Sequence, residues 1–186
     1  MGSYAYQIFA IKWQPIRRGK PMFKVFLVED EIVMREGIRK NIQWEQYGFL
    51  YAGDAPDGEL ALPLIREIQP DLLITDIKMP FMDGLALSEL IRKELPRTKI
   101  VIISGYDDFA YAQQAIRMGV EQYLLKPVIK EKLVELLISL QKKMEAGNRA
   151  AILAVEQNMK SRIGGWLAVG LMAAWASSAA GGRPVR

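Results

Sequence analysis

Cysteine and histidine are both absent from the 186 residues of this chain. Without cysteine there are no disulfides and no thiolate nucleophiles, and without either residue there are no Cys/His zinc sites. The lack of histidine also excludes a histidine general base. Any metal site or reactive group in this sequence is therefore built from carboxylates, hydroxyls, amides and amines.

The centre of the chain also lacks an excess of positive charge, although the net charge of the whole chain is +4. The sum is +4 for residues 1–21, −4 for residues 22–146 and +4 for residues 147–186. The basic balance thus belongs to the two ends, and an acidic centre repels the phosphate backbone of nucleic acids. We therefore do not expect a nucleic-acid groove in residues 22–146.

The N-terminal end has no sustained hydrophobic period. Its short apolar stretch precedes the positive charges, whereas a signal peptide has the reverse order. We expect residues 1–21 to be a disordered or non-native tail, with Met22 as a candidate start of the native protein.

The C-terminal end, residues 147–186, is expected to be an extension in two parts. Residues 148–163 place apolar side chains on one side of a helix and should continue the preceding helix as a linker. Residues 163–182 carry no charge and are long enough to span a bilayer, but they consist mostly of Gly, Ala and Ser. We expect a disordered tail there rather than a membrane helix, and no association with a membrane.

The central segment alternates short β-branched apolar runs with amphipathic stretches, which predicts βα units and a parallel sheet. Pro63 should kink or delay the second helix. We predict an α/β, doubly wound, flavodoxin-like domain with strand order 2-1-3-4-5 and helices on both faces. The expected strands are 24–28, 49–55, 71–75, 99–103 and 122–125, and the expected helices are 32–41, a helix leading to 68, one from the 78–84 loop to 95, 109–118 and 129–144.

Polar groups stand at the carboxyl ends of four predicted strands, and these ends converge on one edge of such a sheet. Three carboxylates in one cleft repel one another unless a cation shares the site, and oxygen-only ligands suit Mg²⁺. A carboxylate beside Mg²⁺, an ammonium and a hydroxyl can attack a phosphoryl group, so Asp76 is the candidate phosphoacceptor. The groups are Glu29, Asp30, Asp76, Ser104 and Lys126.

Each group also has a plainer explanation. The acidic run 29–31 before a helix favours the helix N-terminus through its dipole. Asp76 can begin an ordinary turn, and Lys126 before a proline is unremarkable alone. The improbable feature is that four strand ends of one predicted sheet each carry a group that phosphoryl transfer requires.

Four runs surround these groups: 28–31, 71–84, 104–106 and 124–127. Together they resemble a known family, the CheY-like receiver domain of two-component response regulators. The resemblance implies that Asp76 accepts a phosphoryl group from the phosphohistidine of a sensor histidine kinase. It also implies that Asp30 and Asp76 bind Mg²⁺ directly, that Glu29 acts largely through water, and that the backbone carbonyl of Lys78 completes the ligand set.

The resemblance further implies a switch. Ser104 and Lys126 would contact the phosphoryl group, and Ser104 with Tyr123 matches the hydroxyl and aromatic pair through which receivers report phosphorylation. The change would alter the face formed by helix 109–118, strand 122–125 and helix 129–144. The bond from Lys126 to Pro127 is expected to be cis.

The last predicted helix is also a candidate homodimer surface on this face. Its leucines could serve a dimer or could equally pack on the sheet, and the sequence leaves both open. They are Leu133, Leu137 and Leu140.

Residues 104–112 most resemble receivers that are joined to AraC-type helix-turn-helix output domains. Only 40 residues follow residue 146, too few for two helix-turn-helix units, so no DNA-binding domain is recognisable. We expect a cytoplasmic receiver that acts with a sensor histidine kinase, either alone or as part of a transcriptional regulator.

Two other functions remain open at this point. A Mg²⁺-dependent phosphohydrolase of the haloacid dehalogenase type also forms an aspartyl phosphate, but such enzymes have a second Asp where this chain has Lys78. The third hypothesis is an interaction module that acts without phosphorylation. We favour the receiver, a signalling domain whose only expected turnover is self-phosphorylation and autodephosphorylation.

Overall fold

The computed structural model describes residues 22–105 and 109–179, with side chains for 22–105 and 110–159. The chain divides into two compact units, Met1–Gln141 and Lys142–Arg186. The expected tail 1–21 lies outside the described residues, and the predicted domain limits 22–146 and 147–186 remain predictions.

A five-stranded parallel sheet forms the centre of the first unit, with the order β2-β1-β3-β4-β5. This order and the α/β class confirm the prediction, and each predicted strand agrees with the structure to within one residue at either end. The strands are β1 (Phe23–Val28), β2 (Phe49–Ala55), β3 (Leu72–Asp76), β4 (Lys99–Ser104) and β5 (Gln122–Leu125).

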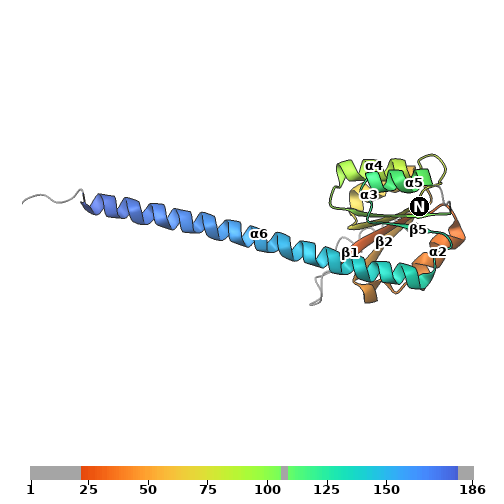
Figure 1. Ribbon diagram of the computed structural model, residues 1–186, viewed down its shortest axis with the longest axis horizontal. Coiled ribbons are helices and arrows are strands. Elements are labelled where there is room, and N and C mark those ends of the chain that lie inside the picture. Colours follow the sequence, from red (N-terminus) through yellow and green to blue (C-terminus); the bar gives the residue numbers. More distant parts are fainter. Residues whose placement is uncertain (1–21, 106–108, 180–186) are drawn as a thin grey trace, which may run out of the picture. The chain divides into compact units, whose positions relative to one another are not determined.

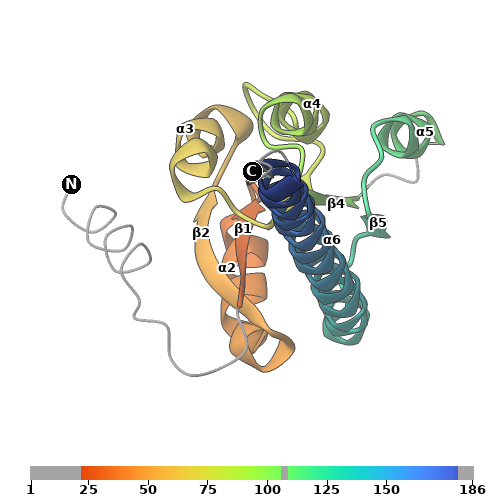
Figure 2. The same ribbon diagram turned by 90° about the vertical axis from the view of Figure 1, so that its left-hand side faces the viewer.

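Helices cover both faces of the sheet. Helices α3, α4 and α5 lie on one side, and α2 and the beginning of α6 lie on the other (Figures 1 and 2). A short 3-10 helix, η1, precedes β2 and was not predicted. The helices of the described residues are α2 (Ile32–Asn41), η1 (Trp44–Tyr47), α3 (Gly58–Ile68), α4 (Gly84–Glu94), α5 (Phe109–Arg117) and α6 (Lys130–Ala179).

The core consists of two apolar layers, one on each face of the sheet. Phe26, Leu73 and Ile102 lie in a buried cluster with residues of α3 and α4. At the alternate strand positions, Leu27 and Ile74 are also fully buried. Because neighbouring residues of a strand point to opposite faces, a strand between two helical layers is apolar at every position.

The start of α3 differs from the prediction. Asp57 caps the helix, since its Oδ1 accepts a hydrogen bond from the N–H of Leu60 at 2.9 Å. The helix then begins at Gly58 and contains Pro63. The expected delay at Pro63 is therefore wrong, because the cap fixes the helix start ahead of the proline.

The end of α6 also differs from the prediction. We expected a helix to residue 144, a linker continuing it to 163 and then a disordered tail, whereas the backbone is helical to Ala179. The backbone is thus helical through the predicted linker and also over 163–179, where we expected disorder. The absence of proline from residues 128–183 permits a continuous helix. Among the described residues, none of the helices combines the length and the apolarity that a bilayer crossing requires.

The leucines that the sequence left open between a dimer and the sheet are buried within this chain. Leu133, Leu137 and Leu140 are 1%, 0% and 4% exposed. They are therefore not available to a second copy. A homodimer through this face remains a prediction that would need other side chains.

Candidate functional site

Three carboxylates meet at the carboxyl end of the sheet. Glu29 and Asp30 follow β1, and Asp76 is the last residue of the adjacent parallel strand β3. One oxygen of each carboxylate lies within 4.8 Å of the others. Glu29 is fully buried, Asp76 is buried and Asp30 is half-buried. The structure thus brings together the three carboxylates that the sequence predicted.

Lys126 joins two of these carboxylates. Its Nζ donates to Asp76 Oδ2 at 2.7 Å and to Glu29 Oε1 at 2.9 Å. Burial alone would lower the pKa of Lys126, but the hydrogen bonds to Asp76 and Glu29 outweigh it and raise the pKa. Lys126 is therefore a fixed cation in the acidic cluster.

The loop that carries Lys126 is held by backbone contacts. The N–H of Lys126 donates to the carbonyl of Ser104 at 2.8 Å, which joins the ends of β4 and β5. The peptide bond from Lys126 to Pro127 is cis, as expected.

Glu29 has one oxygen with partners and one without. Oε1 accepts from Lys126 and, at 3.3 Å, from the N–H of Glu31. Oε2 is buried and has no hydrogen-bond partner within the described residues. Burial raises the pKa of Glu29 to about 7, even though Lys126 acts in the opposite direction. Leaving a buried carboxylate oxygen unsatisfied is costly, so this donor set fits a hard, oxygen-binding cation such as Mg²⁺.

Hydrogen bonds from its two neighbours in the sequence hold Asp76 in place. The N–H of Ile77 donates to Asp76 Oδ1 at 2.6 Å, and the hydroxyl of Thr75 donates to the Asp76 carbonyl at 2.9 Å. The other carboxylate oxygen, Oδ2, is the one that Lys126 contacts. The carboxylate therefore has one defined orientation.

Gly84 begins α4 within the run 71–84 that the resemblance uses, but the sequence did not indicate its close approach to Asp76. A Cβ at this position would lie 1.8 Å from the carbonyl oxygen of Asp76, so only glycine fits. The N–H of Gly84 also donates to the carbonyl of Ile77 at 2.9 Å. Gly84 thus lets the start of α4 close against the strand end that carries Asp76.

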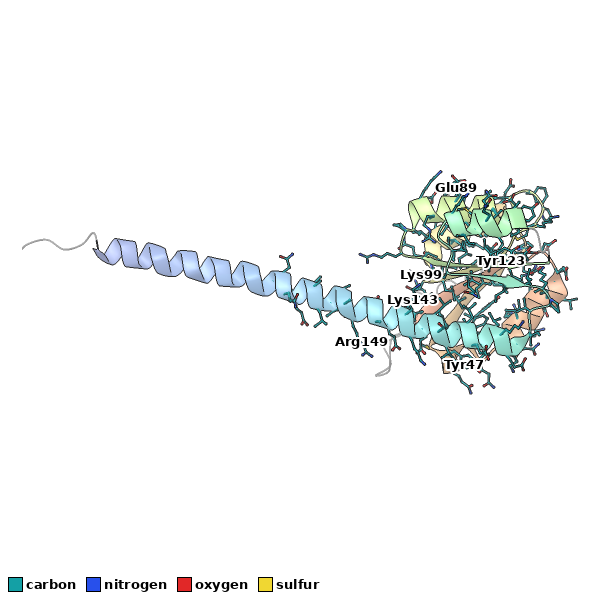
Figure 3. All side chains as sticks on the ribbon, in the orientation of Figure 1. Tyr47, Glu89, Lys99, Tyr123, Lys143 and Arg149 are labelled. Carbon is teal, nitrogen blue, oxygen red and sulfur yellow. The ribbon has the colours of Figure 1, made fainter. Side chains whose placement is uncertain are left out.

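The predicted switch residues lie on adjacent strands. Ser104 is the buried last residue of β4. Tyr123 lies on β5 opposite Ile102, is half-buried and packs against the apolar cluster (Figure 3). The placement agrees with the pair that the resemblance indicated, while their roles in phosphoryl binding and switching remain predictions.

Lys78 lies in the loop between β3 and α4. Its side chain is exposed, and Nζ lies 5.7 Å from the centre of the Tyr111 ring on α5. The use of its backbone carbonyl as a metal ligand remains a prediction.

Arg35 is a second residue for which the sequence gave no signal. Its Nε donates to Asp54 Oδ1 at 3.1 Å, and an NH1 group donates to the carbonyl of Glu29. Asp54 in turn accepts from the hydroxyl of Tyr51 at 3.0 Å, and burial together with Asp54 raises the pKa of Tyr51 above its usual range. Arg35, Asp54 and Tyr51 thus form a hydrogen-bonded network that contacts the main chain of the loop carrying Glu29.

The chain is similar to known signalling proteins. The sequence profile of the family described as response regulator receiver domain matches residues 25–138. An uncharacterized response regulatory protein of Staphylococcus epidermidis is 48% identical over 107 residues, which cover 58% of this chain and 42% of that protein. The uncharacterized transcriptional regulatory protein YesN of Bacillus subtilis is 37% identical over 113 residues, which cover 61% of this chain and 31% of that protein. The chain thus matches less than half the length of either relative.

A solved structure agrees with both the fold and the sequence. The REC domain of AraT, a response regulator from Geobacillus stearothermophilus, superposes with a TM-score of 0.65 at 41% identity. The match covers 68% of this chain and 98% of that domain.

Proposed function

Because the chain belongs to the receiver-domain family of two-component response regulators, we propose that Asp76 is its phosphoacceptor and that a sensor histidine kinase is the donor. Receiver domains are signalling domains that sensor histidine kinases phosphorylate. The observation that carries the assignment is the position of Asp76: it is the last residue of β3, its Oδ2 lies 2.7 Å from Lys126 Nζ, and it shares a cluster with two further carboxylates.

In this proposal, a carboxylate oxygen of Asp76 attacks the phosphorus of the kinase phosphohistidine. The P–O bond forms as the P–N bond breaks, and the histidine is the leaving group. The Lys126 ammonium offsets charge on the phosphoryl oxygens, and the Ser104 hydroxyl donates to one of them. The hydrogen bond from Ile77 N–H keeps the carboxylate in one orientation. Self-phosphorylation from small phosphoryl donors and autodephosphorylation would use the same groups.

Asp30, Asp76, the backbone carbonyl of Lys78 and, through water, Glu29 would hold Mg²⁺. When bound, the ion offsets negative charge on the carboxylates and on the phosphoryl group. The unsatisfied buried oxygen of Glu29 supports this part of the proposal.

The proposed output is a change on the face formed by α5, β5 and α6. Ser104 and Tyr123 lie on neighbouring strands, so a movement of Ser104 toward a phosphoryl group would alter the packing beside Tyr123. The names of relatives such as YesN support a role in transcription control as part of a longer regulator. The cytoplasmic location remains a prediction.

The test is phosphorylation of the full chain with acetyl phosphate and Mg²⁺, followed by intact-mass measurement. We expect one added phosphoryl group in the parent and in Glu31→Gln, which changes an exposed acid next to the site. We expect no adduct in Asp76→Asn, whose fold is checked by circular dichroism. An adduct that persists in Asp76→Asn contradicts the assignment. Steady turnover of phosphomonoesters would instead favour the phosphohydrolase.

A further inference from the structure

An apolar stripe is exposed on α6 within the second unit. Ile152, Val155 and Met159 are 59%, 56% and 53% exposed. Their spacing of three and four residues places them on one face of the helix, as in the seam of a coiled coil. Large apolar side chains that are exposed as a continuous stripe indicate a binding surface.

We propose that the same stripe of a second copy of this chain covers these residues, in an antiparallel two-helix coiled coil centred on residues 152–155. In this alignment Ile152 lies opposite the partner's Val155, and Val155 lies opposite the partner's Ile152. Met159 lies opposite the partner's Asn148. The two-fold symmetry repeats each contact, so Ile152 and Val155 of the two copies cover one another and each Met159 packs beside the partner's Asn148.

The charges that flank the stripe favour the antiparallel direction. Arg149 and Glu156 lie on the same side of the stripe, two helical turns apart. In the antiparallel alignment, Arg149 of each copy faces the partner's Glu156, which gives two pairs of opposite charge. In a parallel, in-register pair, Arg149 would lie beside position 144, whose Met144 side chain is buried, and Glu156 would lie beside the uncharged Ala151, so neither would meet an opposite charge.

Arg149 is available to form an ion pair with the partner's Glu156. Its side chain is 76% exposed and lies 3.8 Å from the Glu145 carboxylate on the same helix; Figure 3 labels it on α6. An exposed pair four residues apart contributes little to helix stability. Antiparallel packing also brings opposite ends of the two helix dipoles together. The proposal is independent of phosphorylation, so it stands or fails separately from the role of Asp76.

The first test is sedimentation equilibrium of the full chain over a range of concentrations. We expect a reversible monomer–dimer equilibrium in the parent and only monomer in Ile152→Asp. Leu153→Asp is the matched control, because Leu153 is similarly exposed at 56% but lies off the stripe. Circular dichroism checks that both variants keep the helix. A parent that stays monomeric overturns the proposal, and so does an equal loss in Leu153→Asp, which would indicate unspecific apolar association.

The second test reads the direction of the pair by charge reversal. Arg149→Glu and Glu156→Arg should each weaken the association by about tenfold. The double variant should restore it, because the two charges have only exchanged places. A double variant as weak as the single ones contradicts the antiparallel pairing.

The third test uses the absence of cysteine from the chain. Under mild oxidation, Asn148→Cys mixed with Met159→Cys should form a disulfide between the two variants. Asn148→Cys alone should not, because the two copies of this position lie roughly 16 Å apart along the helix axis in the antiparallel pair. A disulfide formed by Asn148→Cys alone would show a parallel pair and overturn the proposed direction.

Discussion

The guanidinium of Arg35 donates a hydrogen bond of 2.5 Å to the main-chain carbonyl of Glu29, and a longer one of 3.4 Å to that of Asp30. On its other side Arg35 is fixed by Asp54 of β2, which also accepts from Tyr51. Only 15% of the Arg35 side chain is exposed. The arginine therefore ties α2 and β2 to the loop that carries two of the three carboxylates.

Arg35→Met should weaken Mg²⁺ binding by about tenfold, the lower end of the range for residues that orient metal ligands. The reason is that the loop with Glu29 and Asp30 loses the donor that fixes its carbonyls. Arg35→Lys, which keeps one donor group, should be intermediate. Isothermal titration of the metal-free chain with Mg²⁺ measures the affinity.

Arg39→Met is the matched control for this prediction. Arg39 lies on the same helix and one of its nitrogens is 3.7 Å from Asp54, but its side chain is 42% exposed. It should leave the Mg²⁺ affinity close to that of the parent. Equal effects of Arg35→Met and Arg39→Met would mean that only the positive charge of α2 matters, and that the hydrogen bond to Glu29 does not.

Lys126→Met should lower the free energy of unfolding of the metal-free chain by about 2 kcal/mol, because the buried carboxyl groups of Glu29 and Asp76 lose the cation that they share. This figure is below the usual cost of breaking a buried pair, since 16% of the Lys126 side chain is exposed. Mg²⁺ should recover more stability in Lys126→Met than in the parent. Urea unfolding with and without Mg²⁺ measures both effects.

Lys99→Met tests whether this loss is specific to the acidic cluster. Lys99, which Figure 3 labels, lies at the start of β4. It also forms a 2.7 Å ion pair, with Glu121, but its side chain is 32% exposed. Its removal should cost less than about 1 kcal/mol. The cost should not depend on Mg²⁺. A Mg²⁺ response of Lys99→Met as large as that of Lys126→Met would argue against a local effect at the site.

The sequence was sufficient to predict the strands and the meeting of Glu29, Asp30, Asp76 and Lys126. The strands are short apolar runs bounded by turn residues, and in a doubly wound sheet their carboxyl ends must meet at one edge. Long-range main-chain and side-chain contacts were not predictable in the same way. The hydrogen bond from Arg35 to the Glu29 carbonyl depends on how α2 lies against β2. No local pattern in the sequence encodes that arrangement.

The length of α6 was missed for a different reason. The periodic leucines that indicated this helix report packing on the sheet, and the last of those named, Leu140, is buried there. Beyond the packed part the backbone remains helical because the residues that follow are mostly good helix formers. Apolar periodicity therefore marked the buried part of the helix and not its end.

Gly84→Ala should destabilise the first unit by about 3 kcal/mol, because the new Cβ would lie 1.8 Å from the carbonyl oxygen of Asp76 and the strand end or α4 must shift. We expect lower adduct formation with acetyl phosphate as well, since the shift moves Asp76 relative to Lys126. Gly37→Ala is the control: its Cβ would meet only the Asn41 side chain at 4.0 Å, within α2. It should raise stability by up to about 1 kcal/mol, as alanine does inside a helix. Urea unfolding separates the two, and a Gly84→Ala variant as stable as the parent would contradict the close approach at Asp76.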